Sequence, residues 1–186
     1  MINRYRIFSI INEFAEKQDA IVIAGNGNQA RYLHNTNDRE QNFYMVGSMG
    51  LGPSIALGMA ISLPDKKVIV VEGDGNALMG LGVQPMIGNL RPQNLLHIVL
   101  NNEIYDTTGG QPNVSKTVNY NSIARGCNYE AVFSVNDEIG LRSVLGCNTN
   151  KLTFIEIKMD NSKMDIPRVP YHPTEIKKRF SQAMLR

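Results

Sequence analysis

Two short apolar runs separated by a helix-length segment constrain the fold of this chain most. Residues 68–71 and 98–100 are rich in β-branched side chains, as are parallel strands that are covered on both faces. Between them, residues 77–90 have the length and spacing of a crossover helix. Because such a unit crosses over with right-handed geometry, it predicts Asp74 and Asn102 at the carboxyl ends of two parallel strands.

The rest of the chain repeats this alternation of strand-like and helix-like segments. A stretch rich in glycine and alanine at 52–60 predicts a core helix, and a turn beginning at Phe43 leads into it. The other predicted strands lie at 20–24, 131–135 and 153–157, and the other predicted helices at 5–17, 120–126, 138–145 and 174–185, the last capped by Thr174. The alternation predicts one α/β domain over 1–186, with a doubly wound, mostly parallel sheet flanked by helices.

Composition narrows the class of protein. The chain has 186 residues, enough to bury about 70% of its unfolded surface. Its formal net charge is +2 without any block of like charge, so we expect neither nucleic acid nor a membrane as a partner. Cys127 and Cys147 lack metal-type spacing, and residues 1–10 lack the apolar core of a signal peptide. We therefore expect a cytoplasmic protein with reduced thiols.

The turn after the strand at 68–71 suits a phosphate group and a metal ion. Gly73 and Gly75 flank Asp74, and glycine permits a tight turn whose N–H groups approach a phosphate oxygen at a helix start. The Asp74 carboxylate and the Asn102 amide supply hard oxygen ligands, which suit Mg²⁺ better than a soft metal. Taken alone, these residues also fit an ordinary turn and an ordinary strand end.

A second polar turn follows the predicted strand at 20–24. Asn26, Gly27 and Asn28 lie between that strand and a helix. In doubly wound sheets, ligands bind in the crevice outside the carboxyl ends of the strands. We therefore expect these three residues to line the same crevice as Asp74.

Three motifs resemble those of the thiamine-diphosphate enzymes, whose signature is G-D-G followed, after a gap of this size, by N-N. They are G-S-M-G at 47–50, E-G-D-G-N-A-L-M-G at 72–80 and N-N-E-I-Y-D-T-T-G-G-Q at 101–111. Together they look like the phosphonopyruvate and sulfopyruvate decarboxylases, from about residue 20 to about residue 170. The resemblance implies the thiamine-diphosphate-binding fold and, within it, the pyrophosphate-binding domain.

The resemblance also implies roles for individual residues. Asp74 and Asn102 would bind Mg²⁺ through their side chains, and Ile104 through its backbone carbonyl. The Gly47 carbonyl would accept a hydrogen bond from the aminopyrimidine, and Met49 would bend the cofactor into its V shape. The further residues expected to contact thiamine diphosphate are Asn26, Gly27, Asn28, Ser48, Gly73, Gly75, Asn76 and Tyr105. The related decarboxylases carry a threonine-rich turn where this chain has Asn26 and Asn28.

Residues 103–118 form a long segment without a periodic pattern. Long loops inside compact domains are usually functional or mobile. We expect this loop to close over the cofactor and to be poorly ordered without ligand or partner. Lys116 in this loop is a candidate contact for an anionic substrate, and the alternative is that it is a solvated surface charge. Arg168, in the proline-marked stretch 160–173, has the same two interpretations, an anion contact or a surface charge.

The three histidines do not suggest a different chemistry. His97 lies within an apolar strand, where we expect a hydrogen-bonded core residue, and His34 and His172 lie in polar segments. None has a nucleophile or a metal ligand at a recognisable spacing. The sequence therefore gives no support to a serine triad or a zinc site.

The resemblance covers only the pyrophosphate-binding half of the family. In that family the cofactor ylid attacks the keto carbon of a 2-oxo acid and holds the electrons left when CO₂ departs. Forming the ylid requires a glutamate on a separate pyrimidine-binding domain, and Glu72 and Glu103 stand beside the metal motif, where they do not suit that role. The resemblance thus implies one subunit of a split carbon–carbon lyase whose activating glutamate lies on a companion chain.

The implied substrate is a small anionic three-carbon 2-oxo acid that carries a sulfonate or a phosphonate. We expect the isolated chain to be inactive or nearly so, and to form a homo- or hetero-oligomer. Two alternatives stay open: a non-catalytic cofactor-binding or scaffold module, and a fragment of a longer thiamine-diphosphate enzyme. Met1 and a helix before the first strand favour an intact subunit.

Overall fold

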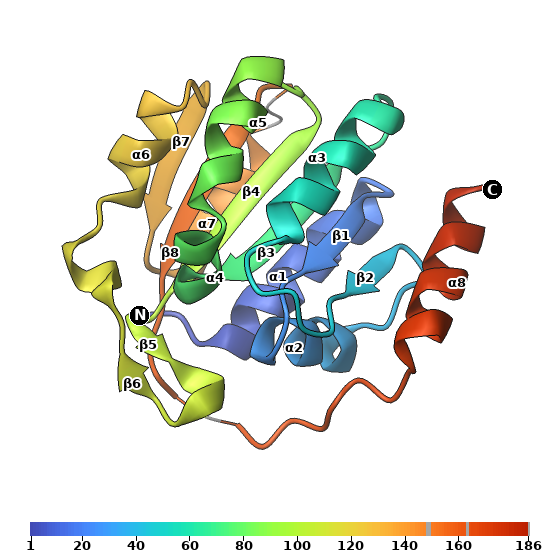
Figure 1. The fold of residues 1–186 in the computed structure, drawn as a ribbon, viewed down its shortest axis with the longest axis horizontal. Coiled ribbons are helices and arrows are strands. Elements are labelled where there is room, and N and C mark those ends of the chain that lie inside the picture. Colours follow the sequence, from blue (N-terminus) through green and yellow to red (C-terminus); the bar gives the residue numbers. More distant parts are fainter. Residues whose placement is uncertain (148–149, 163, 186) are drawn as a thin grey trace.

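The computed structural model describes residues 1–147, 150–162 and 164–185, and its centre is a six-stranded sheet whose neighbouring strands all pair in parallel (Figure 1). Across the sheet the strands are β2 (Asn42–Tyr44), β1 (Ile21–Ala24), β3 (Val68–Gly73), β4 (Leu95–Asn101), β8 (Thr153–Lys158) and β7 (Ala131–Val135). The chain leaves β1 for β2 on one side and later adds β3 on the other, so the strand order switches between β1 and β3. This confirms the doubly wound, parallel α/β fold.

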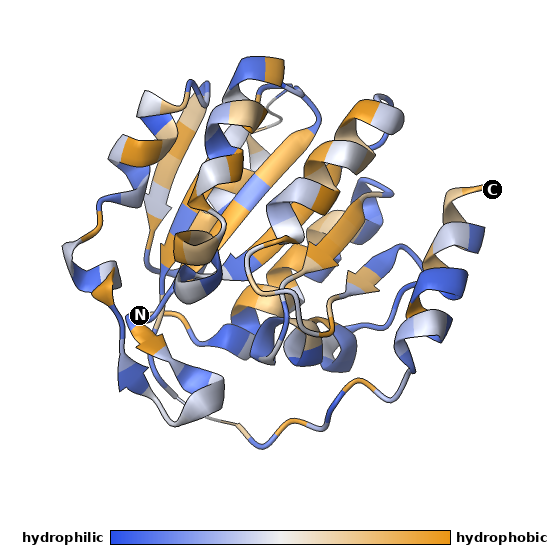
Figure 2. Cartoon of the chain, in the orientation of Figure 1, coloured by the Kyte–Doolittle hydropathy of each residue, from blue (hydrophilic) through white to orange (hydrophobic). Residues whose placement is uncertain are grey.

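Helices cover both faces of the sheet (Figure 1). One face carries α3 (Gly52–Ser62), α4 (Asp74–Met79), α5 (Gln84–Leu90) and α6 (Tyr120–Gly126), and the other carries α1 (Arg4–Lys17), α2 (Asn28–Thr36) and α7 (Glu138–Gly146). Along β3, Ile69 and Val71 pack toward α1 while Val68 and Val70 pack toward α3. The central strands are therefore hydrophobic on both faces, and most of their length has the colour of hydrophobic residues in Figure 2. No helix in the described part of the chain is long and apolar enough to cross a membrane.

The crossover from β3 to β4 is not the single helix predicted over 77–90. A 3-10 turn at Leu81–Val83 separates α4 from α5. Gly80 lies so close to Gly50 that a Cβ at residue 80 would stand 2.3 Å from the Gly50 carbonyl oxygen. Pro85, in the first turn of α5, has no N–H to continue a helix from α4. The close backbone contact and the proline together explain the break.

Two predictions at the β2 edge of the sheet are wrong. The stretch assigned to a turn from Phe43 contains most of β2, a strand of three residues that is too short to show a period. The last helix, α8 (Pro173–Met184), has His172 rather than Thr174 as its N-cap, and the Thr174 hydroxyl lies 2.9 Å from His172 Nδ1. α8 packs on β2 through Phe180, whose ring meets that of Phe43 edge to face.

The segment 103–118 has more regular structure than its sequence shows. It contains an antiparallel hairpin of β5 (Ile104–Tyr105) and β6 (Gln111–Pro112), followed by a 3-10 turn at Val114–Thr117. The hairpin lies at the end of the sheet where β3 and β4 finish (Figure 1). Its mobility without a ligand stays a prediction.

Asp38 fixes α8 and the segment before it to the edge of the sheet. Its carboxylate accepts three hydrogen bonds of 2.5 to 2.6 Å, which come from Tyr44, Tyr171 and Arg179. Burial alone would raise the pKa of Asp38, but the hydrogen bonds outweigh burial and the pKa is lowered. The charged form of Asp38 is thus part of what holds the carboxyl-terminal helix in place.

We expect Asp38→Asn to lower the free energy of unfolding by about 1–3 kcal/mol at pH 7, because it weakens hydrogen bonds to a charged group. Since the folded-state pKa lies below the unfolded value of about 3.9, the stabilisation is complete above that value and is lost as the pH falls through the folded-state pKa. Denaturant unfolding of both proteins from pH 7 to pH 2 measures this. The exposed Asp65→Asn is the matched control, and an equal stability difference at every pH would contradict the assignment.

Candidate active site

Asp74 lies at the point where β3 ends and α4 begins, and it is only 2% exposed. Its Oδ1 accepts a hydrogen bond from the Gly75 N–H at 2.9 Å. Its Oδ2 accepts one from the Glu103 N–H at 2.7 Å and one from Asn113 Nδ2 at 3.1 Å, both on the hairpin segment. The Tyr120 hydroxyl donates to the Asp74 carbonyl, which fixes the backbone. Asp74 therefore joins the sheet to the hairpin.

Asn102 follows β4 and lies beside Asp74, as the strand pairing predicts. Its Oδ1 accepts only a long hydrogen bond of 3.5 Å, from the Ile104 N–H, and its buried Nδ2 has no hydrogen-bond partner among the described residues. The Asn113 N–H donates to the Glu103 carbonyl at 2.9 Å. Because an antiparallel ladder alternates, the carbonyl of Ile104 is turned away from β6. The three residues predicted to bind a metal, Asp74, Asn102 and Ile104, line the same cavity.

A small cavity of about 50 Å³ opens at the switch point between β1 and β3. Most of the predicted site residues line it: Asn26, Asn28, Met49, Gly73, Asp74, Gly75, Asn76, Asn102, Ile104 and Tyr105. The two predicted turns touch directly, since Asn76 Nδ2 donates to Asn26 Oδ1 at 2.8 Å. Gly27 does not line the cavity itself. A Cβ at this position would stand 2.9 Å from the side chain of Thr107, which does line it. Both turns therefore serve one crevice.

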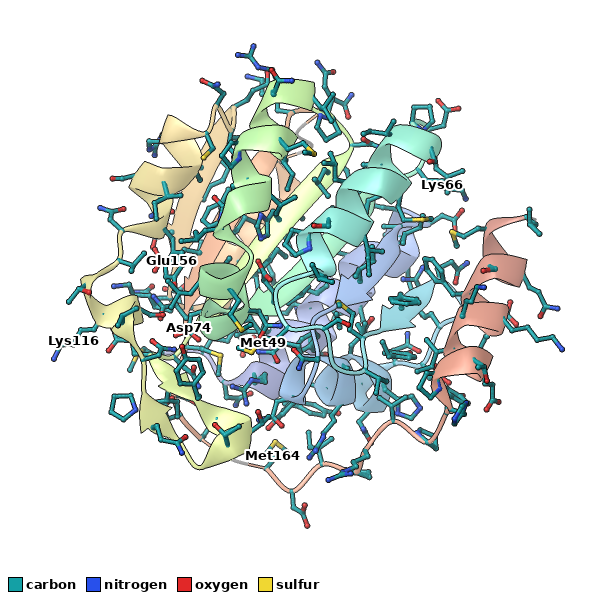
Figure 3. The ribbon with its side chains drawn as sticks, viewed as in Figure 1. Met49, Lys66, Asp74, Lys116, Glu156 and Met164 are labelled. Carbon is teal, nitrogen blue, oxygen red and sulfur yellow. The ribbon has the colours of Figure 1, made fainter. Side chains whose placement is uncertain are left out.

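Gly75 lies beneath two side chains that cover the cavity. A Cβ at this position would be 2.6 Å from Cε1 of Tyr105 and 3.1 Å from Cε of Met49. Figure 3 shows Met49 close to Asp74 in this view. Glycine therefore lets the side chains of Tyr105 and Met49 pack directly on the first turn of α4.

Gly47 and Ser48 lie outside the cavity. Both are exposed and have positive φ angles of 74° and 52°, and Ser48 lines a neighbouring apolar groove with residues of β2 and α3. Lys116 is also exposed and points outward at the edge of the molecule in Figure 3. Arg168 lies on the exposed carboxyl-terminal segment. The roles expected for Gly47, Ser48 and Lys116 stay predictions.

The cavity also contains residues for which the sequence predicted no contact. These are Arg4, Gln29, Asp106 and Thr107, and Asn113 joins them through its hydrogen bond to Asp74. Arg4 Nη1 lies 2.9 Å from Asp106 Oδ2. A lone arginine at the start of a helix gives no signal of burial in the sequence, because arginine is mostly exposed in proteins. Only the tertiary fold brings it to the cavity.

The buried acids near the cavity are engaged elsewhere. Glu72 Oε1 lies 2.8 Å from His97 Nε2, and His97 Nδ1 lies 3.0 Å from the Tyr129 hydroxyl. Burial raises the pKa of Glu72, although the hydrogen bond from His97 opposes the shift. His97 is thus the hydrogen-bonded core residue that the sequence predicts. No group of three or more His, Cys, Asp or Glu side chains comes together in the described ranges to hold a metal.

The available oxygens fit a hard divalent cation held together with phosphate. One buried carboxylate, one amide oxygen and one carbonyl would make a partial oxygen shell of low charge, which phosphate oxygens and water would complete. The orphaned Nδ2 of Asn102 costs about 1–3 kcal/mol while it has no partner. A phosphate oxygen beside it would remove that cost. The cavity therefore has the donors and the acceptors that a metal-bound diphosphate needs.

Comparison with known proteins identifies the class. Residues 24–157 match the family of C-terminal TPP-binding domains of thiamine pyrophosphate enzymes. The chain therefore belongs to the thiamine pyrophosphate enzymes. Within them it belongs with the sulfopyruvate and phosphonopyruvate decarboxylases, as the three motifs indicated.

Two relatives define this branch. The sulfopyruvate decarboxylase subunit beta of Methanococcus maripaludis is 34% identical over 184 residues, which cover 98% of each chain. The phosphonopyruvate decarboxylase of Streptomyces viridochromogenes is 36% identical over 166 residues, which cover 88% of this chain and 42% of that enzyme. The chain thus spans almost all of the beta subunit but less than half of the phosphonopyruvate decarboxylase.

A solved structure shows the same fold. It is a chain from Mycobacterium smegmatis, ascribed to the thiamin diphosphate-dependent enzymes, with a TM-score of 0.71 and 17% sequence identity. The match covers 87% of this chain and 32% of that one. At this identity the likeness supports the fold and carries nothing further about substrate.

Proposed function

We propose that this chain is the pyrophosphate-binding subunit of a split decarboxylase. Its substrate is a three-carbon 2-oxo acid that bears a sulfonate or a phosphonate, and its cofactors are thiamine diphosphate and Mg²⁺. The observation that carries the proposal is the end-to-end match to a beta subunit of sulfopyruvate decarboxylase, 98% of each chain. A protein of this size that matches a whole subunit is expected to need the companion that the word subunit implies.

Asp74 and Asn102 would hold Mg²⁺ through their side-chain oxygens, and Ile104 through its carbonyl. Gly75 and Asn76 would contact the diphosphate at the start of α4, where backbone N–H groups favour an anion. The buried position of Asp74 and the weakly engaged amide of Asn102 support this assignment. The neighbouring turn, with Asn26 and Asn28, supplies further amide groups to the same cavity.

Thiamine diphosphate, when bound, supplies the carbanion that attacks the 2-oxo acid and the electron sink that stabilises the product of CO₂ loss. The chain orients the cofactor and excludes water. Met49 and Tyr105 cover the Gly75 turn, and the hairpin covers Asp74, so this part of the site is shielded from solvent. Gly47, on the exposed loop beside the cavity, would face the aminopyrimidine at the border with the companion.

The companion chain would supply the glutamate that activates the pyrimidine ring. In this chain Glu72 is fully buried against His97, which leaves it unsuited to that role. The experiment that tests the proposal is CO₂ release from sulfopyruvate and from phosphonopyruvate by the chain together with a candidate pyrimidine-binding companion chain. Release by the pair from one of these acids is the expected outcome, and no release from either would contradict the proposal.

We expect Gly75→Ala to weaken thiamine diphosphate binding about tenfold or more in the presence of Mg²⁺. The added Cβ would stand 2.6 Å from the Tyr105 ring, and such overpacking costs about 1–3 kcal/mol. Gly82→Ala is the matched control, because a Cβ there meets no atom within 4 Å in the described chain. Calorimetric titration of both variants makes the comparison. Equal affinities for the two would show that the turn at Gly75 does not contact the cofactor.

A further inference from the structure

Arg4 is a buried cation at the edge of the proposed cofactor cavity. The residue is 3% exposed, and its guanidinium lies over the Tyr32 ring at 5.3 Å. Its Nε has no hydrogen-bond partner among the described residues. Burying a guanidinium is costly unless an anion and hydrogen-bond acceptors compensate it. The position of Arg4 therefore requires an anion beside it.

Asp106 supplies that anion from the hairpin segment. Arg4 Nη1 and Asn28 Nδ2 both lie 2.9 Å from the same oxygen, Asp106 Oδ2. The two donors come from α1 and α2, which pack on the sheet, while the acceptor comes from the 3-10 turn after β5. Two fixed donors that converge on one anionic oxygen define a place where an oxyanion binds.

The same place lies on the wall of the cavity that contains Asp74. Among the described lining residues, Arg4 is the one with a positive charge, whereas Asp74 and Asp106 are both acidic. In the proposed site Asp74 partly cancels the charge of Mg²⁺, so a diphosphate there would be left short of positive charge. The cavity of about 50 Å³ has room for only a few water molecules. A diphosphate that uses the Arg4 and Asn28 donors has to displace the Asp106 carboxylate from them.

We propose that Arg4 and Asn28 form a subsite for the terminal phosphate of the cofactor, and that the Asp106 carboxylate holds this subsite while the hairpin is closed. The proposal rests on the proposed function, because the metal site at Asp74 is what calls for a diphosphate. When the phosphate binds, it takes over both donors, and Asp106 leaves with its segment of the hairpin. Asp106 thus competes with the cofactor from within the chain.

A double-mutant cycle tests this exchange. The full chain, alone and with its companion, is titrated by calorimetry with thiamine diphosphate and, separately, with inorganic pyrophosphate, each with Mg²⁺. We expect Arg4→Met to weaken binding of both ligands tenfold or more, by a similar factor, because the lost contact is to phosphate. We expect Asp106→Asn to tighten binding about threefold or more, because a larger fraction of the subsite is free.

The cycle also gives the sharpest control. In an Arg4→Met background, Asp106→Asn should no longer tighten binding, since the donor for which it competes is gone. Arg6→Met, on the same helix, removes an exposed arginine that pairs with Glu138 at 2.7 Å and should bind as wild type does. The single variant Asp106→Asn keeps Arg4 in place, so the proposal can be tested even if Arg4→Met folds poorly.

Three results would overturn the proposal. The first is an Arg4→Met variant that folds and binds both ligands like wild type, and the second is weaker binding by Asp106→Asn. The third is an Arg4→Met variant with unchanged cofactor affinity but a raised KM for the sulfonated or phosphonated acid, which would assign the subsite to the substrate. Failure of the wild-type chain itself to bind thiamine diphosphate would instead refute the proposed function.

Discussion

An Asp74→Asn variant loses Mg²⁺-dependent binding of thiamine diphosphate, with an affinity about 100-fold lower than that of wild type or lower still. A loss of that size corresponds to about 2.7 kcal/mol. Asp74 is the one charged ligand in the proposed oxygen set, and it is 2% exposed. Removing one partner from a buried charge interaction costs about 2–5 kcal/mol, so the expected loss lies in the range for such contacts.

The dependence on Mg²⁺ separates this role from a structural one. Asp74 also accepts hydrogen bonds from Glu103 and Asn113, so the substitution will loosen the hairpin as well. Loosening alone would lower affinity with and without the metal by the same factor. Calorimetric titrations of Asp74→Asn at several Mg²⁺ concentrations should show an affinity that no longer responds to the metal. Asp65→Asn, an exposed carboxyl in the turn before β3, is the control, and an unchanged response to Mg²⁺ in Asp74→Asn would contradict the assignment.

The purified chain alone releases no measurable CO₂ from sulfopyruvate or phosphonopyruvate, and the companion raises the rate 1,000-fold or more, on the order of what a general acid–base group contributes. The two acids that line the cavity are already occupied. Asp74 accepts three hydrogen bonds from N–H groups, and Asp106 is paired with Arg4 and Asn28. Neither is placed to act as the ring-activating base.

The companion variant that lacks its activating glutamate provides the matched control. Replacing that glutamate with glutamine should leave the affinity of the pair for thiamine diphosphate nearly unchanged while CO₂ release falls to the level of the isolated chain. The measurement is initial-rate CO₂ release at saturating cofactor, combined with calorimetry on the same preparations. Robust decarboxylation by the single purified chain would show that the activating group lies within it, and the split-enzyme proposal would then fail.

The sequence predicts the sheet well because the signals are local. The runs at 68–71 and 98–100 are apolar on every position, and the pairing of Gly73 with Leu100 brings Asp74 and Asn102 to the same end of two neighbouring parallel strands. The broken crossover could not be predicted in the same way. Gly80 adopts its conformation because Gly50, thirty positions earlier, packs against it, and neither residue shows this in its own neighbourhood.

The sequence predicts the site residues that lie at the ends of strands. It does not predict the residues that reach the cavity only through the packing of distant segments. The motif residues Asp74 and Asn102 line the cavity because they come directly after strands β3 and β4 of the sheet. Arg4 and Asp106 lie 102 positions apart and meet only because α1 and the hairpin lie at the same end of the sheet. Gly47 and Ser48 lie on the exposed loop before α3, outside the cavity that the other motif residues line.

The measurement that tests the central claim most directly is a calorimetric titration of the wild-type chain with thiamine diphosphate, with and without Mg²⁺ and with and without the companion chain. Binding that requires Mg²⁺ and that tightens tenfold or more when the companion is present is the predicted result, because the companion completes the pyrimidine side of the site. Absence of binding in every combination would contradict the claim that the turn at Asp74 and the strand end at Asn102 form a thiamine diphosphate site.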